Sequence, residues 1–208
     1  TYDFRTVWGK DIDNFFGMAA SGLPKGLINR IGYPSSSHIK SKDEWIGEVQ
    51  SLLNNTPKFS IYIAPTNNSI DVNVKALEYI EGEFNLVVCL TEDGVINWQK
   101  DGLDDISNYE HKHVLRSVLN TDWQGESLKE GDGSQAYTKN EIITKSYIYD
   151  IEFLKQQNID NSNDPNILAN GNGNAGGWNE NNIHIVAYVY NVANYEIMQA
   201  QQINLKNN

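Results

Sequence analysis

From Pro57 onward the chain alternates apolar and polar residues with a period of two, and this pattern constrains its fold most. Side chains of an extended strand point alternately to opposite faces, so each such run predicts a strand with one buried face. Turn-forming pairs such as Asn67-Asn68 and Asp93-Gly94 separate the runs, and the second pair is typical of a hairpin turn. The expected strands cover residues 59–64, 70–80, 84–92, 95–98, 114–119, 137–149, 183–190 and 195–205. A series of this kind predicts a mainly β protein built as an antiparallel sandwich.

The chain before Pro57 has a helical period instead. One apolar stripe is formed by Ile12, Phe15, Phe16 and Ala19. The segment Ser41-Lys42-Asp43-Glu44 has the form of a capping box and predicts the start of a second helix, with Trp45, Val49, Leu52 and Leu53 as its stripe. We therefore expect a small α/β segment over residues 1–57 and the sandwich over residues 58–208. Within the sandwich, residues 156–182 are rich in Asn, Asp and Gly and predict a long surface loop.

Composition excludes several classes of protein. A formal net charge of −11 argues against nucleic-acid binding, which requires clustered Lys and Arg. The single cysteine, Cys89, stands in an apolar strand-like run and predicts a buried thiol with no intrachain disulfide. No apolar run approaches the roughly 20 residues of a membrane span, so we expect no membrane-spanning helix in this chain. The start at Thr1 fits a mature fragment whose targeting signal has been removed.

Two histidines stand close together in Tyr109-Glu110-His111-Lys112-His113. On one continuous strand His111 and His113 would face the same side and could supply two ligands to a metal. A zinc site needs three or four ligands, and no further ligand stands at suitable spacing nearby. The favoured interpretation is a strand entrance whose polar side chains hydrogen-bond to neighbouring loops, and we predict no metal and no other cofactor.

The sequence shows no catalytic constellation. Ser35-Ser36-Ser37-His38 places serines beside a histidine, but without a strained elbow or an orienting acid, so we expect a polar turn. Binding is easier to support, because Trp98, Trp123 and Trp178 fall at strand ends or in loops. If those loops meet, the three indoles would form a platform for a sugar ring or a peptide. The alternative is that each tryptophan fills a gap at the edge of the core.

Several segments, taken in order, resemble the 28-kDa outer membrane protein family of Bacteroidetes. They are Gly22-Leu23-Pro24 with Asn29-Arg30, residues 86–96 with Gln99, the segment from Tyr109 through His111 and His113 to Arg116, and residues 186–190 with Gln199-Ala200. The resemblance covers most of the chain. It implies an extracytoplasmic, usually lipid-anchored protein of the outer membrane or cell surface, attached to the membrane only through an anchor outside this chain. It also implies a thioredoxin-like domain followed by an immunoglobulin-like sandwich.

Pro24 resembles the proline, usually cis, that faces the redox motif of thioredoxin-like folds, although an ordinary trans turn proline is the alternative. The C-x-x-C motif of such folds is missing from this chain, so residues 1–57 resemble only the second half of the domain. Its apolar residues, including Phe15, Phe16, Trp45 and Leu53, need cover from the sandwich or from another chain, which motivates a hypothesis of homo-oligomerisation.

We therefore expect a non-enzymatic surface binding or adhesion protein whose partner is an extracellular protein, peptide or glycan. The alternative is an accessory or inactive member of the thiol-disulfide system whose redox motif lies outside this chain.

Overall fold

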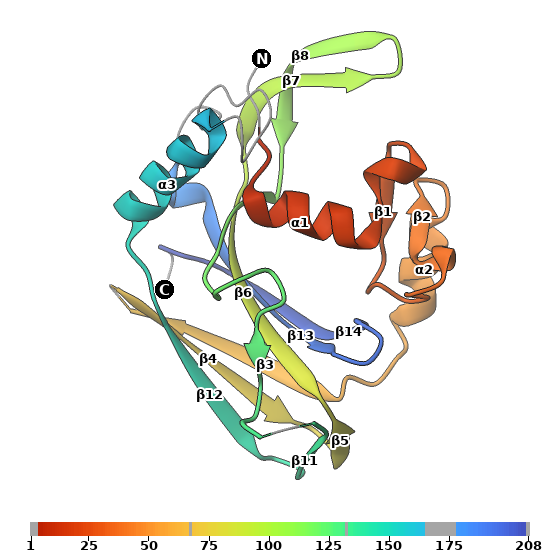
Figure 1. The fold of residues 1–208 in the computed structure, drawn as a ribbon, viewed down its shortest axis with the longest axis vertical. Coiled ribbons are helices and arrows are strands. Elements are labelled where there is room, and N and C mark those ends of the chain that lie inside the picture. Colours follow the sequence, from red (N-terminus) through yellow and green to blue (C-terminus); the bar gives the residue numbers. More distant parts are fainter. Residues whose placement is uncertain (1–3, 67, 132, 165–177, 207–208) are drawn as a thin grey trace.

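The computed structural model describes residues 4–66, 68–131, 133–164 and 178–206 of the 208-residue chain. Two antiparallel sheets form its body (Figure 1). One sheet has the strand order β12-β4-β3, and the other has the order β10-β6-β13-β14 with β9 also paired to β6. The bounds are Phe59–Pro65 (β3), Ser69–Ala76 (β4), Phe84–Glu92 (β6), Val114–Val118 (β9), Glu126–Ser127 (β10), Ile142–Ile148 (β12), Ile183–Asn191 (β13) and Ile197–Asn204 (β14). The expected immunoglobulin-like sandwich behind a small α/β segment is confirmed.

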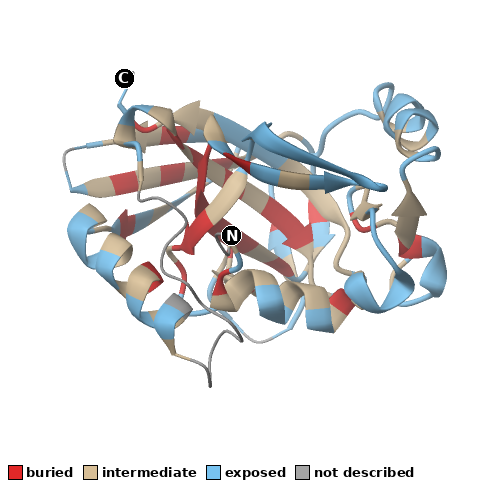
Figure 2. Cartoon of the chain, turned by 90° about the horizontal axis from the view of Figure 1, so that it is seen from above, coloured by how far each residue is buried: buried red, intermediate tan, exposed pale blue. Residues whose placement is uncertain are grey.

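The core lies between the two sheets and follows the period of two in the sequence. In β4, Ile70, Val72, Val74 and Ala76 are all fully buried, whereas the residues between them are partly exposed. They belong to one apolar cluster with the inward residues of β6 and β13 (Figure 2). Val87 and Cys89 of β6 are buried in a second cluster, on the outer face of the larger sheet. β6 is therefore covered on both faces, as its continuous apolar run requires.

The N-terminal segment provides part of that outer cover, because Trp8 packs against the second cluster. It contains α1 (Val7–Phe16), β1 (Lys25–Leu27), β2 (Ile39–Ser41) and α2 (Trp45–Leu52). The Thr6 hydroxyl caps α1 by accepting a hydrogen bond of 3.1 Å from the Gly9 amide. Gly17 ends the helix in the left-handed region with φ 70°, so Ala19 lies in a 3₁₀ turn and not in the helix as predicted.

The second helix begins later than its capping box predicts. The Glu44 carboxylate does accept a hydrogen bond of 2.8 Å from the Ser41 amide, but the four residues 41–44 form a turn and α2 starts at Trp45. Trp45 packs so closely on Gly26 that a Cβ there would lie 3.1 Å from the indole. Of the residues expected to need cover, Phe16 is buried in the N-terminal segment, whereas Leu53 remains 74% exposed.

Several predicted strands have different bounds. The run 70–80 is divided into β4 and β5 (Ile80–Gly82), and the run 137–149 into β11 (Gln135–Tyr137) and β12. The run 95–98 is longer, as β7 (Val95–Asp101), and it pairs with an unpredicted strand, β8 (Asp104–His111). Asp93-Gly94 therefore does not close a hairpin between β6 and β7, because β7 pairs only with β8 among the described strands.

The prediction of a surface loop over residues 156–182 is wrong for its first part. α3 spans Ile151–Asn163 and begins at Asp150, whose carboxylate accepts a hydrogen bond of 3.1 Å from the Phe153 amide. The helix forms because Ile151 and Leu154 pack against the core while Asn158 is buried one turn further along. The prediction from composition did not detect these three inward-facing residues. Residues 165–177 of the predicted loop lie outside the described residues.

Candidate functional site

The β7–β8 hairpin makes no strand pairing with the two main sheets of the described structure. Its two strands pair with each other and with no other described strand, and residues 104–110 of β8 are all exposed. Figure 1 shows the hairpin reaching out beyond the two sheets. A two-stranded ribbon that packs on no core is marginally stable by itself. Its exposed apolar side chains are therefore candidates for contact with another molecule.

Trp98 lies at a bulge in this hairpin. Asn97 pairs with Tyr109 and Gln99 with Ile106, so two residues of β8 stand opposite Trp98 alone. The Trp98 amide donates a hydrogen bond of 2.7 Å to Asn97 Oδ1. Its carbonyl oxygen lies 3.3 Å from His111 Nε2, which acts as the donor. Side chains thus satisfy the backbone groups of Trp98, and the indole itself is 54% exposed.

The register gives the hairpin two different faces. Ile96 and Trp98 share one face, and they are 57% and 54% exposed. On the opposite face the His111 ring lies between the rings of Phe4 and Tyr109, with centroid distances of 4.8 Å and 4.9 Å. The face with Ile96 and Trp98 is the more open one, so it is the candidate binding surface.

The structure separates the two histidines that were predicted to share a face. His111 ends β8, whereas His113 follows in the left-handed region with φ 53°, which breaks the strand between them. The His113 amide donates a hydrogen bond of 2.6 Å to Asp93 Oδ1. Within the described ranges, no group of three His, Cys, Asp or Glu side chains is arranged to hold a metal ion.

Arg116, three residues after His113, forms a buried ion pair with Glu92. Its Nε lies 2.7 Å from Glu92 Oε2, and the two side chains are 2% and 4% exposed. Burial lowers the pKa of Arg116, while the neighbouring Glu92 carboxylate opposes that shift. Glu92 Oε1 also accepts a hydrogen bond of 2.7 Å from the Asn179 amide, and the Arg116 carbonyl accepts one of 2.6 Å from Asn158. This network joins β6, β9, α3 and the chain before β13.

Arg30 joins the N-terminal segment to the sandwich. Asn29 and Arg30 both adopt left-handed conformations, with φ 48° and 58°, and this turn directs the Arg30 side chain onto the larger sheet. The guanidinium lies 5.0, 5.1 and 5.4 Å from the ring centroids of Phe16, Tyr188 and Tyr190. It donates a hydrogen bond of 3.0 Å to the Tyr188 hydroxyl, and the Asn29 carbonyl accepts one of 2.9 Å from Ile197. The Leu23–Pro24 peptide bond that precedes β1 is cis.

Comparison with known proteins shows the family of this chain. The sequence model of the family described as Outer membrane protein Omp28 matches residues 11–174. The chain belongs to the Omp28 family. Its location is therefore extracytoplasmic, in association with the outer membrane. Among curated proteins none matches the chain.

Three solved structures are similar to this Omp28-family chain. HBP35 of Porphyromonas gingivalis has 14% identity and a TM-score of 0.49 over 78% of this chain, which spans 45% of HBP35. A domain of the outer membrane lipoprotein Omp28 from Porphyromonas gingivalis has 18% identity and a TM-score of 0.38, over 73% of this chain and 90% of that domain. Protein AGR_C_4864 from Agrobacterium tumefaciens has 8% identity and a TM-score of 0.51, over 100% of this chain and 75% of that protein. At 8% identity, the similarity to protein AGR_C_4864 shows a related fold alone.

The three tryptophans of the Omp28-family chain occupy different surroundings. Trp123 is only 8% exposed and packs with Phe15 at a centroid distance of 4.9 Å. Trp178 is partly buried against the core between the sheets, and its Nε1 has no hydrogen-bond partner among the described residues. In the described part of the chain no ring contact joins any two of the three indoles, so they do not form one platform. Trp98 alone presents its indole on an open surface.

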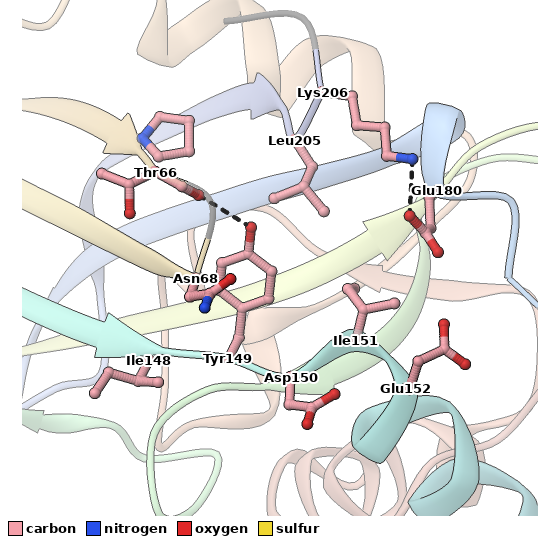
Figure 3. Close-up of a pocket in the computed structure, with 11 residues that line it drawn as sticks. Thr66, Asn68, Ile148, Tyr149, Asp150, Ile151, Glu152, Glu180, Leu205 and Lys206 are labelled. Carbon is pink, nitrogen blue, oxygen red and sulfur yellow. Dashed lines mark hydrogen bonds and ion pairs between the residues drawn. The ribbon is translucent and has the colours of Figure 1, made fainter.

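Figure 3 shows a cavity of about 790 Å³ at the end of the sandwich, beside the start of α3. Its charged groups already pair with one another. The Glu180 carboxylate lies 2.8 Å from both Lys155 Nζ and Lys206 Nζ, and these ammonium groups lower its pKa to about 2. The Tyr149 hydroxyl donates a hydrogen bond of 3.3 Å to the Thr66 carbonyl. An anionic or cationic ligand would have to displace these contacts, so the hairpin is the stronger candidate site.

The nucleophiles singled out in the sequence are not activated. Both ring nitrogens of His38 face carbonyl oxygens, at 2.5 Å from Ser35 and 2.9 Å from Phe16, so the ring is engaged and does not serve a nearby serine as a base. Burial raises the pKa of the Cys89 thiol to about 12, which keeps it protonated and unreactive at neutral pH.

Sequence reasoning did not find the hairpin as a unit. The signal that could have found it is the pair Asp101-Gly102 followed by Leu103, a turn signal between two segments that can extend as strands. Gln99, one of the family residues, lies in this hairpin next to Trp98 and donates a hydrogen bond of 3.0 Å to the Lys100 carbonyl.

Proposed function

We propose that this Omp28-family chain is a non-catalytic binding or adhesion protein at the cell exterior, and that the hairpin face with Trp98 contacts its partner. The partner is an extracellular protein, peptide or glycan. One observation carries the proposal: an indole more than half exposed stands on a bulge whose backbone is held by Asn97 and His111. Tryptophan is one of the residue types enriched among the side chains that contribute most to binding at protein interfaces.

The surroundings of Trp98 support binding better than catalysis. Ile96 extends the apolar surface, while Lys100 and Asp105 form an exposed pair 3.3 Å apart at its margin. An apolar centre with a polar margin is typical of a protein or sugar contact. The thiol-disulfide alternative receives no support from the residues of this chain, because its one cysteine is buried and protonated.

Trp98→Ala tests the proposal. The wild-type protein is applied to a glycan array and to a displayed peptide library, and the ligands that bind are measured again by calorimetric titration. We expect Trp98→Ala to weaken the binding of those ligands by about tenfold or more, with the melting temperature almost unchanged because the indole packs on no core.

Tyr62→Ala is the matched control, because Tyr62 is a 69% exposed aromatic residue on β3. It should leave binding intact. If Trp98→Ala and Tyr62→Ala bind every ligand as the wild type does, or if no ligand binds the wild type, the hairpin is not the binding surface.

A further inference from the structure

Strand β12 forms one edge of the three-stranded sheet. It pairs with β4 from Ile142↔Lys75 to Ile148↔Ser69 without a register shift, and with no other described strand. Figure 1 shows it as the outermost strand of that sheet. The opposite edge, β3, ends at Pro65, and Gln199 of β14 donates a hydrogen bond of 3.1 Å to the Phe59 carbonyl across it. β12 is therefore the more open edge of the two.

The hydrogen bonds at its two ends show which backbone groups of β12 point outward. Ala76 donates to the Glu141 carbonyl at 3.0 Å, and Tyr149 donates to the Asn68 carbonyl at 3.2 Å. Odd-numbered residues therefore bond to β4, and in an antiparallel ladder the even-numbered ones face the other way. The outward residues are Ile142, Thr144, Ser146 and Ile148. In the described structure none of their backbone groups has a partner beyond this edge.

This edge lacks the usual protection against pairing with another strand. Its sequence, Ile-Ile-Thr-Lys-Ser-Tyr-Ile, contains no proline or glycine and has high β-propensity. The one charged residue, Lys145, is 20% exposed and lies 3.7 Å from Glu126, so its ammonium group is directed at its own subunit. At the two ends, Ile142 and Ile148 are 59% and 85% exposed.

We propose that β12 pairs with β12 of a second copy of this chain, antiparallel across a two-fold axis. With the axis at Lys145, Ile142 stands opposite the partner's Ile148, and Thr144 stands opposite the partner's Ser146. This register matches outward residues with outward residues and gives four pairs, each of which exchanges two backbone hydrogen bonds. It also covers both exposed isoleucines.

A second copy fits better than an unrelated peptide because this register places residues of the same kind opposite each other: isoleucine opposite isoleucine at both ends, and one hydroxyl residue opposite another between them. A two-fold interface requires such self-complementarity. The hydroxyls of Thr144 and Ser146 are already oriented, since they donate hydrogen bonds of 2.7 and 2.6 Å to Asn73 and Asp71. Lys145 would face the partner's Lys145 at the axis, where each ammonium group keeps its own Glu126.

The first test is Thr144→Pro, measured by sedimentation equilibrium at physiological salt, where screening limits repulsion between chains of net charge −11. Proline removes an outward N–H and leaves the bonds to β4 intact, so the fold should persist by circular dichroism. We expect the wild type and Thr144→Val to show a concentration-dependent dimer, and Thr144→Pro to weaken it by about tenfold or more. A wild type that stays monomeric, or a dimer unaffected by Thr144→Pro, would overturn the proposal.

A cysteine pair tests the register even if the proline variant does not fold. Residues directly opposite on antiparallel strands have Cα atoms about 4.5–5.5 Å apart, which suits a disulfide. Under mild oxidation, Thr144→Cys and Ser146→Cys should each remain largely uncrosslinked alone and should form a covalent heterodimer when mixed. The buried Cys89 does not compete. Failure of the mixture to crosslink, or equal crosslinking of either variant alone, would refute this pairing.

Discussion

Arg116 and Glu92 are 24 residues apart in sequence, and their side chains meet at 2.7 Å where both are almost fully removed from water. The same two neighbouring segments meet a second time, because Asp93 accepts the amide hydrogen of His113. Glu92 and Asp93, at the end of β6, therefore bind Arg116 of β9 and the residue just before that strand. A buried pair of this kind is costly to break, since removing one partner leaves the other charge without compensation.

Replacing Arg116 by Met should destabilise the protein by about 3–5 kcal/mol, because the Glu92 carboxylate remains buried without its guanidinium. Urea unfolding followed by circular dichroism measures this free energy. The double variant Glu92→Leu/Arg116→Met should recover much of the loss, since it buries no unpaired charge. If the free energy of unfolding of Arg116→Met lies within about 1 kcal/mol of the wild-type value, the buried-pair interpretation is wrong.

Arg30→Met tests how the N-terminal segment is attached. The variant keeps an apolar side chain but loses the contacts with three aromatic rings and the hydrogen bond to Tyr188, so we expect a loss of about 2 kcal/mol. Hydrogen exchange should increase in α1 and α2, with less change in the sandwich strands. Lys42→Met, on an exposed turn, is the control. Equal protection of α1 in both variants would show that Arg30 is not the attachment point.

Glu180 should contribute to acid stability. Hydrogen bonds from Lys155 and Lys206 lower its pKa from 4.5 to about 2. A carboxyl whose folded pKa is depressed stabilises the protein above the unfolded value, and this stabilisation is lost as the pH falls toward the folded value. Between pH 4.5 and pH 2, Glu180→Gln should therefore lose less stability than the wild type. Glu78→Gln is the control, and parallel stability curves for wild type and Glu180→Gln would disprove the contribution.

Cys89 should be unreactive in the folded protein. Its thiol is buried in β6, and burial raises its pKa to about 12, so little thiolate forms at neutral pH. A thiol reagent monitored by absorbance should react only after urea is added. The exposed thiol of Thr144→Cys provides the positive control in the same assay. Rapid labelling of native wild-type protein would mean that this strand opens locally.

The fold followed from the sequence where one periodicity dominates. β13 buries every second residue and the central strand β6 is apolar on both faces, so these two strands were predicted with nearly correct bounds. β4 also buries every second residue, but its predicted run continued through the turn that leads into β5. β8 was missed because none of residues 104–110 is buried, which leaves no apolar alternation to detect. α3 was missed because only a narrow stripe of an otherwise polar segment is buried.

The candidate site also combines features that a local sequence pattern predicts with features that it does not predict. The sequence alone determined the mainly β class, the burial of Cys89 and the family residues, because each depends on local pattern. Only the tertiary structure decided that Arg30 reaches Tyr188, that Arg116 meets Glu92, that Trp123 is buried and that Trp98 remains exposed. These outcomes depend on which segments come together across long separations, and the free energy of such contacts is not encoded in any one stretch of chain.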